Sequence, residues 1–133
     1  MANGPGIKEW CSVTMIASGA CYKYGLVDLS SAKTVAVPSA ATTKPFGVCM
    51  DDAADGEPVR VLLLGIFPGI DCDGDLNNGD FVLGKDNTAE YHKLEASSNG
   101  TTAGTVGRVI DTDSTLADDE KMVLWNFINN RVT

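Results

Sequence analysis

The chain has 133 residues and a mass of 14.0 kDa, which fits a single domain with one hydrophobic core. Ten Lys and Arg residues against 18 Asp and Glu residues give a net charge of −8. This balance argues against binding to nucleic acid or to an anionic membrane, since both attract clustered cations. No apolar run approaches the roughly 20 residues that span a bilayer, and the N-terminus lacks the layout of a secretory signal.

Short runs rich in Val, Ile and Thr, separated by Gly, Asp, Asn and Pro, predict strands rather than helices. Residues 1–9 contain two glycines, one proline and few apolar side chains, which indicates an arm outside the core. From Trp10 to Met15 apolar and polar residues alternate, as in a half-buried strand. Further strands are expected at 20–29, 33–38, 46–50, 58–67, 80–84, 90–95, 105–111 and 121–128. Strands this short and this closely spaced predict an all-β barrel or sandwich.

Two segments of the sequence resemble each other. Residues 46–67 and 106–128 each run from a glycine through alternating apolar residues and an acidic loop into a long apolar strand. The two glycines, Gly47 and Gly107, lie 60 residues apart. Two similar hairpins would suit a pseudo-symmetric barrel. Within the second segment, residues 115–120 are expected to form an acidic turn with at most one turn of helix.

The four cysteines, Cys11, Cys21, Cys49 and Cys72, have neither zinc-knuckle nor CxxC spacing, and the chain has one histidine. We therefore expect no zinc site. Two disulfides are possible in an oxidising compartment, and buried reduced thiols are the favoured interpretation.

The acidic segment 71–80 is compatible with a calcium loop in its alternating carboxylates. It fails as an EF-hand, because Leu76 stands where glycine is needed and Val82 where a bidentate glutamate is needed. We expect a solvated acidic turn, with no metal and no cofactor. Thirteen of the 18 acids fall in 51–57, 71–80 and 111–120, which would form one anionic rim if these loops met at one end.

Catalytic patterns are missing from the sequence. There is no GxSxG motif, no phosphate-binding glycine loop, and His92 is the single candidate base, placed by alternation on a strand surface. We therefore expect no enzyme activity. The segment 7–16 has two open interpretations: a free strand that adds to the sheet edge of a partner, or a strand that completes the chain's own sheet.

The order of short glycine and turn motifs is similar to one known family. The motifs are Ser18-Gly-Ala20, Pro45-Phe-Gly-Val48, Asp55-Gly-Glu57, Val59-Arg-Val61, Gly65-Ile66, Asn78-Gly-Asp-Phe-Val82 and Ala103-Gly-Thr-Val-Gly-Arg-Val109. Together they resemble the capsid decoration proteins of tailed bacteriophages, also called head-stabilisation or cement proteins, of the lambda head-decoration type. The resemblance covers roughly residues 18–128.

This resemblance implies an all-β, small β-barrel or β-tulip-like domain at 17–133, preceded by an N-terminal arm and first strand at 1–16. It implies a structural protein, made in the host cytoplasm, on the outer surface of the virion. There it would bind the major capsid protein, form a homotrimer and bridge capsomers of the expanded head. By their position in the arm, the candidate capsid contacts are Ile7, Trp10 and Val13.

Two other classes of protein remain open. A biotinyl- or lipoyl-type carrier barrel needs a modified lysine at a hairpin tip, and Lys85 lacks the apolar neighbours of such a site. A carbohydrate-binding or adhesin module, on a virion or a cell surface, would stack exposed aromatics such as Trp125 or Tyr91 on sugars.

Overall fold

The computed structural model describes residues 6–38, 45–72, 76–84, 92–97, 105–111 and 120–128. These residues form strands and turns only, so the all-β prediction is confirmed. The expected turn at 115–120 lies almost entirely outside them. The strands are β1 (Lys8–Ala17), β2 (Leu26–Ser31), β3 (Thr34–Ala36), β4 (Gly47–Cys49), β5 (Pro58–Ile70), β6 (Phe81–Gly84), β7 (Leu94–Ser97), β8 (Gly107–Asp111) and β9 (Glu120–Asn126).

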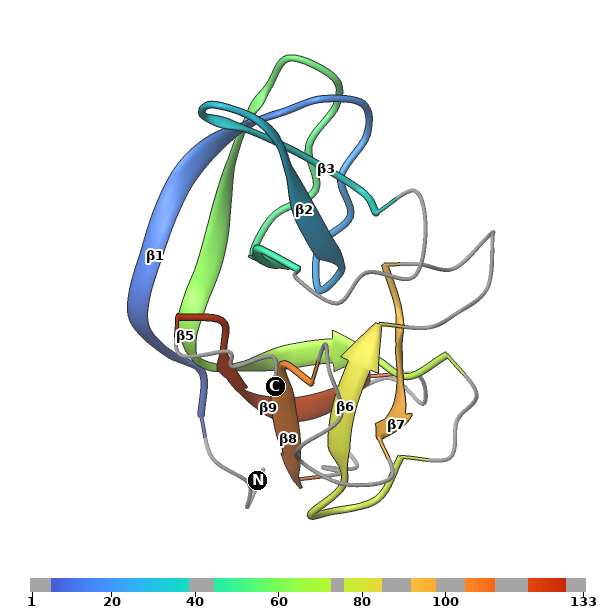
Figure 1. The fold of residues 1–133 in the computed structure, drawn as a ribbon. Coiled ribbons are helices and arrows are strands. Elements are labelled where there is room, and N and C mark those ends of the chain that lie inside the picture. Colours follow the sequence, from blue (N-terminus) through green and yellow to red (C-terminus); the bar gives the residue numbers. More distant parts are fainter. Residues whose placement is uncertain are drawn as a thin grey trace.

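The strands pair in the order β1-β3-β2-β4-β5-β9-β8-β6-β7, and β1 also pairs with β5. The extra pairing closes β1, β3, β2, β4 and the first half of β5 into a ring, which we call the first unit (Figure 1). The second half of β5 continues into a further set with β9, β8, β6 and β7, the second unit (Figure 1). The long strand β5 therefore belongs to both units.

The two units have the same topology. In the first, β1 pairs antiparallel with β5 and parallel with β3. In the second, β5 pairs antiparallel with β9, and Asp71, the residue that follows β5, makes a parallel bridge to Leu94 of β7. Individual hydrogen bonds correspond as well. The amide of Phe46 donates to the Val27 carbonyl (2.8 Å) in the first unit, as Val106 does to Val82 (2.9 Å) in the second. Tyr24 donates to Cys49 (2.8 Å), as Gly79 does to Val109 (2.7 Å). Ser18 donates to Val35 (2.8 Å), as Cys72 does to Leu94 (3.0 Å).

The predicted pair of similar hairpins is confirmed as β4–β5 and β8–β9, both antiparallel. A glycine opens each hairpin because the neighbouring strand leaves no room for a side chain. A Cβ atom on Gly47 would lie 2.8 Å from the Leu62 carbonyl oxygen, and one on Gly107 would lie 2.7 Å from the Leu124 carbonyl oxygen.

Buried apolar side chains form two clusters. One fills the ring of the first unit and consists of Ala17, Cys21, Val27, Val35, Cys49, Ala53, Val59 and Val61. The other contains Trp125, Phe67, Leu94 and further residues of the second unit, and also Leu26, Val48 and Leu62 from strands of the first. Strand β4, residues 26–27 of β2 and residues 61–62 of β5 are therefore buried on both faces, whereas β5 begins with alternating exposed and buried residues.

Strand β1 differs from the free arm that the sequence suggested. It starts at Lys8 and lies in the chain's own sheet, with eight residue pairs to β5 between Lys8 and Ile16. Of the two interpretations of this segment, the structure shows the strand that completes the sheet. Residues 1–5 lie outside the described part of the chain, and the division at residue 16 stays a prediction.

Two expected strands are displaced. The segment 20–29 was expected to be one strand, but β2 begins only at Leu26; Cys21 makes an isolated bridge to Ala53, and Tyr24 turns the chain with a φ of 72°. The expected strand 90–95 is replaced by β7 at 94–97. His92 lies in the turn before it, half-buried, with its ring 4.9 Å from that of Tyr22.

Asp28 on β2 gives a prediction for the pH dependence of stability. Its Oδ1 is buried without a hydrogen-bond partner among the described residues, and burial raises the pKa of its carboxyl to about 6. The folded state thus holds this proton more tightly than the unfolded state, whose pKa is about 4. The charge therefore destabilises the fold above pH 6, and this cost disappears as the pH falls from 6 to 4.

We expect Asp28→Asn to raise the free energy of unfolding by about 1 to 2 kcal/mol at pH 8 and to have no effect at pH 4. Urea denaturation at both pH values measures this. Asp51→Asn is the matched control of opposite sign, because the hydrogen bond from Arg60 lowers the pKa of Asp51. A gain for Asp28→Asn that is equal at both pH values would show that the charge is not the cause.

Candidate interaction surface

The structure separates the three residues that the sequence suggested for capsid contact. Ile7 and Trp10 are exposed, with 55% and 57% of their surfaces accessible. Val13 is only partly accessible and packs against the cluster inside the first unit. Ile7 and Trp10 thus remain available to a partner, whereas Val13 contributes to the core.

Trp10 owes its exposure to an irregularity in the β1–β5 ladder. Glu9 pairs with Gly65 and Cys11 with Leu64, so Trp10 has no partner residue on β5. A bulge of this kind removes one residue from the ladder and reorients its side chain. The backbone of β1 passes very close to Gly65 here, since a Cβ atom on Gly65 would clash with the Lys8 carbonyl oxygen.

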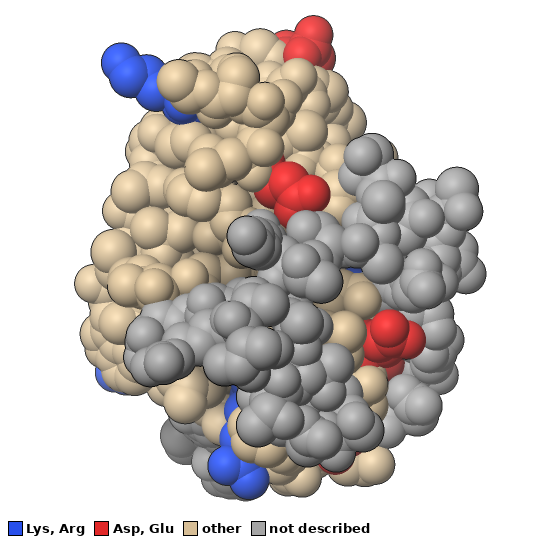
Figure 2. Space-filling model, in the orientation of Figure 1, with Lys and Arg blue, Asp and Glu red and all other residues tan. Residues whose placement is uncertain are grey.

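The second edge of β1 is open along most of its length. Only Ile16 and Ala17 pair with β3, and from Lys8 to Met15 no other described strand pairs with that edge. Figure 1 shows β1 at the outer margin of the molecule. The side of the first unit seen in Figure 2 carries few charged side chains, and residues 10–17 contain none. The part of this open edge from Trp10 to Met15 carries no charged residue, and such an edge can accept a further strand.

A row of side chains crosses the outer face of the second unit. Strand register places Lys8 opposite Ile66, Ile66 opposite Leu124, Leu124 opposite Arg108, and Arg108 opposite Phe81. Residues directly opposite each other in an antiparallel sheet point to the same face. We call these five residues the exposed row.

The exposed row combines apolar and cationic groups. Lys8, Leu124 and Arg108 are exposed, and Ile66 and Phe81 are half-buried. The guanidinium of Arg108 lies 4.8 Å from the centre of the Phe81 ring, and its Nε donates a hydrogen bond to the Gly79 carbonyl oxygen (3.0 Å). These contacts fix the cation over an apolar surface. The row is therefore an apolar strip with a positive charge near each end, on a chain of net charge −8.

The equivalent row of the first unit is a buried interface. It consists of Leu26, Val48 and Leu62, which stand opposite one another in the same register and are each 0% accessible. These three residues pack against the second unit. The same face of the repeated unit is thus covered in one copy and exposed in the other, with Leu124 37% accessible. This makes the exposed row the leading candidate for a docking surface.

A second apolar surface lies between the two units. A groove of about 230 Å³ is lined by Leu29, Pro45, Phe46, Leu63, Phe127 and Ile128. Leu29 and Ile128 are 55% and 57% accessible. Unlike the exposed row, this groove contains no cation.

The described parts of the acidic segments do not form one rim. Figure 1 shows 51–57 reaching the top of the first unit and 76–80 at the bottom of the second. Asp71 is not solvated as expected: it is 2% accessible, accepts a hydrogen bond from the Leu76 amide (3.0 Å) and lies 3.7 Å from Lys121. Asp80 accepts a hydrogen bond from the Asn77 amide (2.8 Å). Both carboxylates stabilise the turn. Asp73, Asp75 and most of 111–120 lie outside the described residues.

No three His, Cys, Asp or Glu side chains gather as a metal site within the described ranges. Lys85 and Tyr91 lie outside those ranges.

Trp125 is fully buried and donates a hydrogen bond to the Phe67 carbonyl oxygen (2.8 Å), so it cannot stack on a sugar. The exposed row has no signature in the sequence, because its members come from five strands and share a face only through strand register.

Comparison with known proteins gives a likeness of fold. No known protein family and no curated protein matches the sequence of this chain. No helix in the described part of the chain is long and apolar enough to cross a membrane. Among solved structures, the chain is similar to the head fiber gp8.5 N base of bacteriophage phi29, with a TM-score of 0.62 and 15% identity over 88% of this chain and 94% of that one. The chain therefore shares its fold with the base of a phage head fiber protein.

Proposed function

We propose that this chain is a structural protein of a phage virion that binds the outer surface of the capsid. The observation that supports it most is the shared fold with a head fiber protein, which extends over nearly the whole of both chains. The family resemblance of the ordered glycine and turn motifs supports the same class of protein. The role needs an exposed binding surface and no catalytic group.

The exposed row, extended by Trp10 on β1, is the proposed contact surface. Its apolar members gain about 25 cal/mol for each Å² of surface removed from water. Lys8 and Arg108 select a partner surface with carboxylates at matching positions, because charges of opposite sign steer and orient association. The partner is the major capsid protein. The open edge of β1 provides backbone groups for additional strand pairing beside this surface.

A stabilising role requires that one assembly contact several capsid subunits. We propose that three copies associate on the capsid and bridge neighbouring capsomers of the expanded head. Three weak contacts in one trimer bind with a high effective concentration, so a single copy needs only modest affinity. This also permits a monomer in dilute solution.

The test is to mix the purified protein with expanded heads that lack it and to image the particles by cryo-electron microscopy. We expect saturable density at symmetric positions on the outer surface, with copies in groups of three. Decorated heads should also resist heat or chelation better than bare heads. Heads that remain bare at saturating protein would refute the proposal, and isolated single copies would refute the trimer.

Leu124→Asp places a charge in the centre of the exposed row and is expected to weaken capsid binding at least tenfold, about 1.4 kcal/mol. Leu29→Asp is the matched control, because Leu29 is an equally large exposed side chain outside the row. Cosedimentation with heads measures both variants. If Leu29→Asp abolishes binding while Leu124→Asp does not, the contact surface is the groove between the units.

A further inference from the structure

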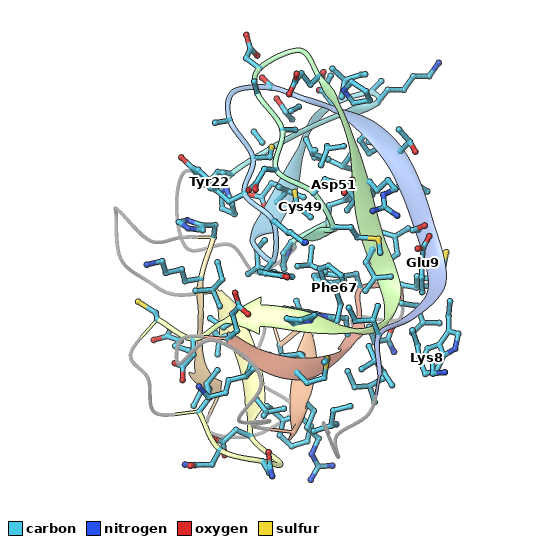
Figure 3. The ribbon with its side chains drawn as sticks, turned by 180° about the vertical axis from the view of Figure 1, so that it is seen from behind. Lys8, Glu9, Tyr22, Cys49, Asp51 and Phe67 are labelled. Carbon is cyan, nitrogen blue, oxygen red and sulfur yellow. The ribbon has the colours of Figure 1, made fainter. Side chains whose placement is uncertain are left out.

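Cys21 and Cys49 form a pair of thiols inside the first unit. Cys21 follows β1 and Cys49 ends β4, and they are 1% and 0% accessible within the same apolar cluster. Their side chains are hydrogen-bonded to each other, and the Cys21 thiol also contacts the Val35 carbonyl oxygen at 3.9 Å. Figure 3 shows Cys49 in the interior of this unit. Both residues are free thiols in the structure.

The backbone holds the two residues firmly in place. Cys21 is fixed to Ala53 by hydrogen bonds in both directions, at 2.8 and 3.0 Å. Cys49 donates its amide proton to the Gly25 carbonyl (2.9 Å) and accepts one from Tyr24 (2.8 Å). The segment that follows Cys21 is thus tied directly to Cys49.

The two thiols differ in their access to solvent. A shallow hollow of about 390 Å³ opens over Cys21, and it is lined by Ala20, Cys21, Tyr22, Asp52, Ala53, Ala54 and Glu57. Cys49 does not line it. The hollow therefore gives an oxidant an approach to Cys21 rather than to Cys49.

We propose that Cys21 and Cys49 form a reversible disulfide by exchange with a small-molecule disulfide such as oxidised glutathione. The Cys21 thiolate attacks one sulfur of the oxidant, forms a mixed disulfide and releases one glutathione thiolate. The Cys49 thiolate then attacks the Cys21 sulfur and releases the second. The two cysteines are oxidised to a disulfide, and the oxidant is reduced to two glutathione thiols. The two protons lost by the cysteines are taken up by these thiols.

The order of attack follows from the surroundings of each sulfur. Burial raises the pKa of both thiols; the hydrogen bond between them partly reverses this for Cys21, while Cys21, Asp51 and Asp52 raise the pKa of Cys49 further. Cys21 is therefore the readier nucleophile, and Cys49 reacts once a mixed disulfide is beside it. With both thiols buried, we expect a slow reaction, over minutes to hours.

The disulfide would stabilise the first unit. It links residues 28 positions apart, and closing a loop of that length restricts the unfolded chain. We expect the melting temperature to rise by about 10 °C. Reduction with dithiothreitol should restore the original value.

The experiment uses the full chain with Cys11→Ser and Cys72→Ser, which removes the two half-buried thiols. After incubation with oxidised glutathione under native conditions, mass spectrometry should show the loss of two hydrogens and no remaining free thiol. Peptide mapping should join Cys21 to Cys49. A protein that keeps both thiols while folded, and oxidises only when urea unfolds it, would overturn the proposal.

Two further substitutions test the order of attack. In the same background, Cys49→Ala should retain one glutathione on Cys21, because the second step cannot occur. Cys21→Ala should gain no glutathione. The folded state of each variant is checked by its melting curve. Faster modification of Cys49 in Cys21→Ala than of Cys21 in Cys49→Ala would refute the assigned order and with it the role of the hollow.

Discussion

Replacing Trp125 by alanine is expected to lower the free energy of unfolding by about 3 to 5 kcal/mol, and the melting temperature by about 10 to 20 °C. Trp125 is the largest fully buried side chain and lies in the cluster shared by both units. Its ring stacks on Phe127 at 5.5 Å and passes so close to residue 69 that only glycine fits there. Truncation therefore leaves a cavity and removes the hydrogen bond from the indole to the Phe67 carbonyl oxygen.

Trp10→Ala is the matched control for this prediction. It removes the same side chain from a position where 57% of it is accessible, and we expect a change within about 0.5 kcal/mol. Trp125→Phe keeps most of the apolar volume but loses the hydrogen bond to Phe67, so its effect should lie between the two. Urea denaturation followed by far-UV circular dichroism measures all three variants. Equal losses for Trp10→Ala and Trp125→Ala would contradict the assigned core.

The two hairpin glycines should behave alike. We expect Gly47→Ala and Gly107→Ala each to destabilise the protein by about 1 to 3 kcal/mol, because a methyl group at either position collides with the backbone of the adjacent strand. A side chain can rotate away from such a contact, but a carbonyl oxygen in a ladder cannot move without breaking pairing. The similarity of the two costs follows from the equivalent positions of Gly47 and Gly107 in the two units.

Gly6→Ala is the control for the glycine series, since no atom lies within 4 Å of a Cβ atom at that position and its φ is not positive. The change should leave the free energy of unfolding nearly unaltered. Thermal melts of the three variants at one pH are sufficient. A large loss for one hairpin glycine and none for the other would show that the two units differ at this position.

Local residue patterns predicted much of the fold. Alternation from Trp10 to Met15 and the apolar run 58–67 predicted β1 and β5, because side chains in a strand point alternately to opposite faces. The likeness of 46–67 to 106–128 predicted the two equivalent hairpins, and Gly47 and Gly107 marked where strands pass too close for a side chain. These features depend on neighbours along the chain or within one hairpin.

The tertiary structure determines which segments of the chain each strand pairs with and packs against. The sequence of 7–16 suits either a free strand or an internal one, and only the nearby edge of β5 selects the latter. Leu62 and Leu124 occupy equivalent positions in similar sequences, yet one is buried and the other exposed. The reason is that the first unit packs on the second, while no described strand packs on the equivalent face of the second. The pairing of Cys21 with Cys49, 28 residues apart, likewise arises only when β4 closes the ring. Contacts between distant segments depend on the whole arrangement of strands, which no local pattern encodes.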